Sequence, residues 1–159
     1  MKLFNLLLIL LSTQILYAQK VEVTSDSMNA IDLKKEVHFI GNAKVKQLKD
    51  WIHADEIIVH LNETNKAKMY EAIGNVTFEF QNEKGHYIGS SNLVKYYPLK
   101  SLYVLIGKAK VKDVLNHRSA KGNEITVDML TGNSKVKSKP TEKGKKQAPV
   151  VFTFDSEQK

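Results

Sequence analysis

The side chains that could perform acid–base or metal chemistry are spread thinly along this chain. Adjacent Asp55 and Glu56 would point to opposite faces of a strand, so they cannot work together as a general acid and base. The sequence contains no nucleophile elbow, phosphate-binding loop or dinucleotide fingerprint. The five histidines lack the short spacing of metal ligands on a helix or loop: His38, His53, His60, His86 and His117. The sequence therefore predicts a protein that is not an enzyme, with no catalytic residue, no metal site and no cofactor.

The N-terminus has the features of a secretory signal peptide. Lys2 precedes an apolar run from Leu3 to Leu11, and Ala18 is a small residue at the expected exit. We expect cleavage after Ala18, and a retained N-terminal anchor is the alternative. Residues 1–18 are then the signal peptide, and residues 19–159 have the length of a single domain.

Charge and cysteine content restrict the partners and the source of stability. The formal net charge is +7, but an exported chain rarely meets nucleic acid, so we expect no nucleic-acid partner. Anionic lipid or sugar phosphate suits this charge better. The chain has no cysteine, so disulfides cannot stabilise it and the domain must bury a substantial apolar surface.

Apolar and polar residues alternate with a period of two along most of the exported part. One segment places Phe39, Ala43 and Val45 on one face and Lys44 and Lys46 on the other. Such alternation is typical of strands with one buried and one solvated face. The pattern returns at residues 72–80 and 103–111, and the sequence therefore predicts an all-β fold.

Three glycines recur in these strands at a constant interval of 33 residues: Gly41, Gly74 and Gly107. A polar segment precedes each glycine and is interpreted as a turn: Ser25-Asp26, Ala54-Asp55 and Ser91-Asn92. A repeat of this length predicts one supersecondary unit that stacks on its neighbours. By parity the glycines point inward. They mark either a bend in the sheet, which we favour, or space left for another molecule.

The C-terminal part differs in composition from the repeats. A Lys-rich segment around residues 137–148 contains Pro140 and Gly144 and has little to bury, so we expect a mobile loop. Residues Val150 to Phe154 follow it and are predicted to form the last edge strand.

The order of these motifs resembles the OstA-like family of lipopolysaccharide transport proteins. The resemblance covers about Val21 to Val136 and depends on the following segments: Ser25-Asp26, Phe39-x-Gly41-Asn42-Ala43-x-Val45, Ala54-Asp55-Glu56-Ile57, Ala72-x-Gly74-Asn75-Val76 and Gly107-Lys108-Ala109-x-Val111. The third copy departs from the pattern, because Lys108 replaces the asparagine and Ser91-Asn92 replaces the alanine-aspartate pair.

The resemblance implies an open β-jelly-roll, the OstA-like fold, that carries the acyl chains of lipopolysaccharide between two sheets. It implies a periplasmic bridge from the inner to the outer membrane, built by head-to-tail homo-oligomers. It also implies OstA-like partners anchored in the inner membrane and located in the outer membrane. The alternative is a periplasmic scaffold or adhesin module that transports nothing and buries the same face as a closed core.

Parity along the strands selects the residues expected to line the lipid-binding groove. These are Ala43, Val45, Val59, Val76, Phe78, Phe80, Leu105, Ala109 and Val111. The strands near Val21–Val23 and Val150–Phe154 are expected to be the free edges through which copies of the chain pair.

Overall fold

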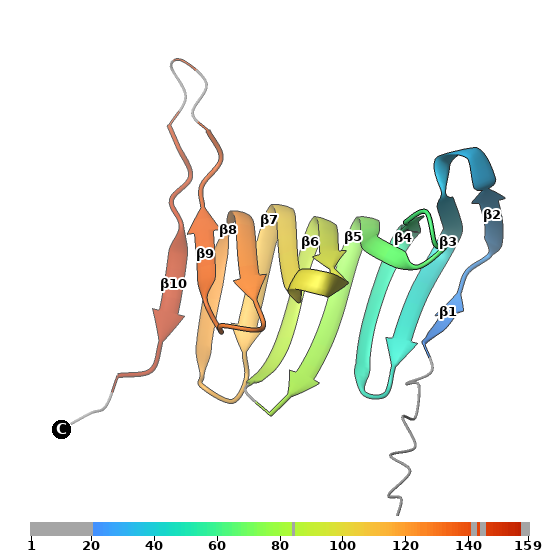
Figure 1. Cartoon of the computed structure of the whole chain (residues 1–159). Coiled ribbons are helices and arrows are strands. Elements are labelled where there is room, and N and C mark those ends of the chain that lie inside the picture. The colour runs from blue at the N-terminus through green and yellow to red at the C-terminus, as the bar shows by residue number, and fades with distance from the viewer. Residues whose placement is uncertain (1–20, 84, 141–142, 144–145, 157–159) are drawn as a thin grey trace, which may run out of the picture.

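The computed structural model describes residues 21–83, 85–140, 143 and 146–156. The expected signal peptide lies outside these residues. The described chain forms one ten-stranded antiparallel sheet, in which six long strands are joined in sequence order from β3 to β8 (Figure 1). The elements are β1 (Glu22–Thr24), β2 (Ser27–Ile31), the 3-10 turn η1 (Asp32–Lys34), β3 (Glu36–Gln47), β4 (Asp50–Leu61), β5 (Ala67–Asn82), β6 (Gly85–Tyr97), η2 (Pro98–Lys100), β7 (Leu102–Asp113), β8 (Arg118–Asp128), β9 (Ser134–Lys137) and β10 (Val151–Phe154).

The sheet bends near the middle of its long strands, where a glycine lies in each of β3, β5 and β7. Gly41, Gly74 and Gly107 all adopt a φ of 79°, a value that favours glycine because it has no Cβ. The residue after each glycine also has a positive φ, and the register of the sheet shifts at these positions. These are β-bulges, which bend a strand sharply. The preferred interpretation of the glycines as bends is therefore confirmed.

The row of bends divides the single sheet into two facing layers. Layer A contains β2, β9 and residues 36–40, 56–61, 67–73, 93–97, 102–106 and 124–128. Layer B contains β1, β10 and residues 43–47, 50–54, 76–82, 85–91, 109–113 and 118–122. This is the open β-jelly-roll that the sequence predicts.

Small residues occupy the narrow part of the roll beside the bends. Ala43 pairs with Ala54, and Ala109 pairs with Gly122. The three alanines are at most 3% exposed. Larger buried side chains, such as Ile57 and Leu105, fill the space farther from the bends.

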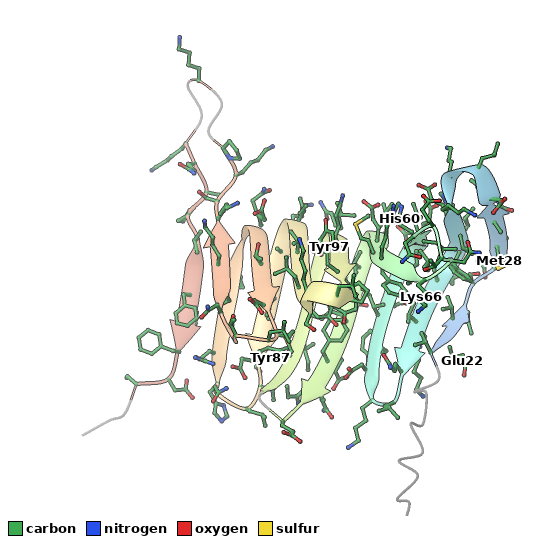
Figure 2. All side chains as sticks on the ribbon, in the orientation of Figure 1. Glu22, Met28, His60, Lys66, Tyr87 and Tyr97 are labelled. Atoms are coloured by element: carbon green, nitrogen blue, oxygen red, sulfur yellow. The ribbon has the colours of Figure 1, made fainter. Side chains whose placement is uncertain are left out.

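Both ends of the roll are open. Among the residues that the structure describes, β1 and β2 each pair only with β3 at one end, and β9 and β10 each pair only with β8 at the other. Figure 2 shows Glu22 and Met28 at the β1–β2 end. The expected free edges near Val21–Val23 and Val150–Phe154 therefore lie at opposite ends of the sheet.

The inward direction expected for the glycines is wrong. A Cβ at Gly41 or Gly74 would lie 2.4 or 2.3 Å from the Oδ2 atom of Asp26 or Asp55, and both aspartates are exposed. At Gly107 it would lie 2.7 Å from the Nδ2 atom of Asn92. The space at each glycine is therefore filled by a side chain of this protein.

Two of the three polar segments interpreted as turns lie inside strands. Asp55 belongs to β4 and Asn92 to β6, whereas Asp26 lies between β1 and β2. The carboxylates of Asp26 and Asp55 each accept a hydrogen bond of 2.9 Å from the amide of Asn42 or Asn75. These aspartates brace the bulges and do not cap turns.

The Lys-rich segment starts at the end of β9, which includes Lys137. Between β9 and β10 the described residues form no strand, and Figure 1 shows this part projecting beyond the sheet. Residues 141–142 and 144–145 lie outside the described part, and the expected mobility stays a prediction.

Candidate functional site

An interior space lies between the two layers in the β1 half of the roll. It is a cavity of about 410 Å³, within the roughly 300–1,000 Å³ of small-molecule sites. Its walls are mostly apolar and aromatic: Val21, Val45, Gln47, Asp50, Trp51, Ile52, Ile57, Tyr70, Ala72, Phe80, Val94, Tyr96, Pro98 and Tyr103. The carboxylate of Asp50 accepts a hydrogen bond of 2.7 Å from the backbone N–H of Gln81. We call this space the interior cavity.

Aromatic rings form a ladder along the interior. Ring centroids are 6.1 Å apart for Tyr70 and Tyr96, 4.3 Å for Tyr96 and Tyr103, 4.7 Å for Tyr103 and Phe80, and 5.0 Å for Phe80 and Phe78. Distances of this kind are typical of favourable aromatic pairs. The ladder begins in layer A and ends in layer B, because Phe80 and Phe78 belong to the second half of β5.

The contact between Tyr103 and Phe80 interrupts the interior. On its other side is a much smaller cavity of about 20 Å³, and both rings line both spaces. The groove between the layers is therefore open in the β1 half and nearly closed in the β10 half.

The tyrosines that line the interior cavity stay neutral, and the carboxylate of Asp50 lines it with them. Burial raises the pKa of the Tyr103 phenol far above its usual range, and the neighbouring Tyr96 acts in the same direction. Burial also raises the pKa of Tyr70. The rings therefore offer apolar faces and neutral hydroxyls, which suits a hydrocarbon ligand and not an anion.

The nine residues selected by parity all lie on the inner faces of their strands, but they do not line one groove. Eight belong to the apolar core or pack against it, and Val59 is half-buried without joining that cluster. Val45 and Phe80 line the interior cavity, while Phe78, Leu105 and Val111 line the smaller one with Phe80. Ala43, Val76 and Ala109 are at most 1% exposed and belong to the closed region beside the bends. A role of these nine residues in lipid binding stays a prediction.

Sequence reasoning missed several residues that line the interior cavity. Tyr70, Tyr96 and Val94 are among them. Val94 and Tyr96 are two residues apart in β6, so the buried position of Val94 would have placed Tyr96 inward. Tyr97, labelled in Figure 2, has the opposite parity and does not line that cavity.

The scattered histidines are partly brought together on the outer face of layer A. His38 contacts Glu56 at 2.8 Å and Glu36 at 3.1 Å, and His60 contacts Glu36 at 3.3 Å and Glu71 at 3.1 Å. The hydrogen bond to Glu56, followed by that to Glu36, raises the pKa of His38. The His38 hydrogen bond lowers the pKa of Glu36.

These contacts between histidine and glutamate side chains connect β3, β4 and β5, and they become ion pairs where the histidine is protonated. Within the described ranges no group of three or more His, Cys, Asp or Glu side chains could hold a metal ion. None of the helices in that same part is long and apolar enough to cross a membrane.

Comparison with known proteins finds one family model and a set of solved structures that are similar to this chain. The family model described as the LptA/(LptD N-terminal domain) LPS transport protein matches residues 22–133. The fold is similar to the crystal structure of LptH, the LptA-homologous periplasmic component of the lipopolysaccharide transport device of Pseudomonas aeruginosa. That similarity has a TM-score of 0.73 at 15% sequence identity, and it covers 87% of this chain and 96% of LptH. A search of curated proteins found no match.

Proposed function

This chain belongs to the LptA and LptD N-terminal domain family of lipopolysaccharide transport proteins, and we propose that it binds lipopolysaccharide in the periplasm and passes it towards the outer membrane. The acyl chains occupy the interior cavity, and the saccharide remains outside the two layers. The observation that carries this proposal is the cavity itself, about 410 Å³ lined mainly by apolar and aromatic side chains.

The open ends support the bridging part of the proposal. The side chains of Val151, Phe152 and Phe154 are 45%, 57% and 61% exposed on an edge strand. Unpaired strand edges of this composition invite pairing with another chain. Because the β1 and β10 edges differ, pairing between them does not close on itself and produces head-to-tail filaments. The same edges would serve OstA-like partners at the two membranes.

A photo-crosslinking experiment tests the site. A benzophenone amino acid at Tyr96, inside the interior cavity, should capture lipopolysaccharide under ultraviolet light. The matched control is the same amino acid at Tyr97, the adjacent tyrosine of opposite parity, which should capture little. Equal capture at both positions would remove the support for an interior site.

A closed scaffold is the second candidate, and the contact between Phe80 and Tyr103 favours it. With centroids 4.7 Å apart, these rings close the middle of the groove. A scaffold that carries nothing predicts no capture at Tyr96 or Tyr97, even with lipopolysaccharide in large excess.

A further inference from the structure

Six ionisable side chains form a continuous series of contacts across four strands on the outer face of layer A. We call them the acid–histidine network, and His60 is labelled in Figure 2. Neighbouring members are 2.8 to 3.3 Å apart, and their side chains are 16–31% exposed. In order of contact the members are Glu56 of β4, His38 and Glu36 of β3, His60 of β4, Glu71 of β5 and Lys95 of β6.

Both imidazole rings of the network contact a carboxylate with each of their two nitrogen atoms. His38 places Nδ1 2.8 Å from Glu56 and Nε2 3.1 Å from Glu36. His60 places Nδ1 3.3 Å from Glu36 and Nε2 3.1 Å from Glu71. A neutral imidazole has only one N–H, so its bare nitrogen would face a carboxylate, whereas an imidazolium presents a proton at both nitrogens. The geometry of both rings therefore suits the charged form.

The charges of the network cancel only when both rings are protonated. Three glutamates then face two imidazolium groups and the ammonium of Lys95, which contacts Glu71 at 3.2 Å. With both rings neutral, two negative charges lack a partner within the network. Nearby carboxylates that share a site repel each other, and this repulsion acts across the strands that carry them.

The surrounding elements supply little charge that could replace the two imidazolium groups. β2 contains no ionisable side chain. In η1, Lys34 interacts electrostatically with Glu36, while Asp32 pairs with Lys35 at 3.1 Å. On β5 and β7 the residues opposite His60, Glu56 and Lys95 are uncharged: Met69, Ile73 and Val104. The protonation of His38 and His60 therefore controls the charge balance of this face.

The opposite face of the same strands forms the layer A wall of the interior cavity. Successive side chains of a strand point to opposite faces, so the sequence neighbours of network residues point inward. The neighbours of Glu56, Glu71 and Lys95 that line the cavity are Ile57, Tyr70, Ala72, Val94 and Tyr96. Widening the cavity on this side moves β3, β4, β5 and β6 relative to one another. Every contact in the network except that between His38 and Glu36 joins two strands and opposes such movement.

We propose that the acid–histidine network is a pH-sensitive brace, which holds the layer A wall of the interior cavity in acid and releases it as the pH rises. The inference rests on the proposed function, because the regulated site is the cavity assigned there to acyl chains. Hydrogen bonds to Glu56 and then Glu36 raise the pKa of His38. The stabilisation from this ring is therefore fully present below about pH 6.5 and is lost as the pH rises through the raised pKa of the folded state.

The test follows the binding of N-phenyl-1-naphthylamine, an apolar fluorophore without charge in this pH range, to the full folded protein by stopped-flow fluorescence. Binding should be about fivefold faster at about pH 8.5 than at about pH 5.5, since cross-strand ion pairs no longer hold the wall. His38→Gln combined with His60→Gln should bind at the faster rate at both pH values, because glutamine stays neutral. His86→Gln is the matched control. His86 is also half-buried and contacts one carboxylate, Glu79 of layer B, at 2.7 Å, so this variant should keep the full pH dependence.

Glu36→Gln provides a second readout, because Glu36 contacts both imidazole rings. It should move the midpoint of the pH dependence of the binding rate to lower pH, whereas a purely structural contact would leave that midpoint unchanged. Equal rates at both pH values in the wild type, or full pH dependence in the double histidine variant, would overturn the brace and leave the proposed function standing. Absence of fluorophore binding at both pH values would overturn the brace and the proposed function together.

Discussion

Gly74→Ala should destabilise the protein by about 2–3 kcal/mol, and the structure divides this cost into two parts. The first is the backbone: a φ of 79° costs an L residue about 1–2 kcal/mol. The second is steric: the new Cβ would lie 2.3 Å from the Oδ2 atom of Asp55, so the carboxylate must move. Its movement breaks the 2.9 Å hydrogen bond from Asn75, which contributes about 1 kcal/mol.

A double-mutant cycle separates these two parts. Asp55→Ala alone should cost about 1 kcal/mol, because it removes only the hydrogen bond to Asn75. Added to Gly74→Ala, it should cost nothing further, since that bond is already broken and the clash is relieved. The double variant should therefore lose about 2–3 kcal/mol, roughly 1 kcal/mol less than the sum of the single changes.

Equilibrium unfolding in urea measures all four proteins of the cycle. Gly132→Ala is the matched control, because Gly132 has a φ of 76° but no atom within 4 Å of its added Cβ. It should show the backbone cost of about 1–2 kcal/mol without the steric part. Strict additivity in the cycle, or equal losses for Gly74→Ala and Gly132→Ala, would refute the steric role assigned to Asp55 at Gly74.

Three further predictions follow from the interior, the outer face and the edge. Phe80→Ala should join the two cavities and increase the affinity for a fluorescent fatty acid, and it should lower the free energy of unfolding in urea by about 2–3 kcal/mol. Phe39 lines neither cavity, so Phe39→Ala should leave that affinity unchanged. His38→Gln should remove a stabilisation that is fully present below about pH 6.5 and is lost as pH rises through the raised pKa of folded His38. The unfolding free energies of the wild type and the variant should therefore converge at high pH. Phe152→Lys should abolish concentration-dependent oligomers in analytical ultracentrifugation, because charge on an edge strand blocks pairing. Leu99 is a 90% exposed leucine in η2, and Leu99→Lys should leave the oligomers unchanged.

Period-two alternation predicted the architecture well because a strand with one buried face has few alternatives. It placed residues such as Phe78 and Leu105 on the inner side, where they are 2% exposed. It failed at the glycines, because a bulge inserts a residue and breaks the parity on which the prediction depends. The role of Asp55 was missed because its partners Gly74 and Asn75 are on the next strand.

The outer-face contacts could not be predicted from the sequence, because they depend on register between strands. His38 and Glu56 are far apart in the chain and meet only because Ile40 pairs with Glu56 across β3 and β4. The pairing of Lys110 with Lys121 is equally a consequence of register. The departures of Asn92 and Lys108 from the repeat were visible in the sequence, but the position of the Asn92 side chain against Gly107 was not.

Nuclear Overhauser effects between bound lipopolysaccharide and aromatic side chains test the central claim most directly. If acyl chains occupy the interior cavity, their methylene protons should show effects to the rings of Phe80, Tyr96 and Tyr103, which all line it. Tyr97, which does not line that cavity, should show none. Effects confined to Tyr97, or none to any of these four rings under conditions where lipopolysaccharide is bound, would contradict the account.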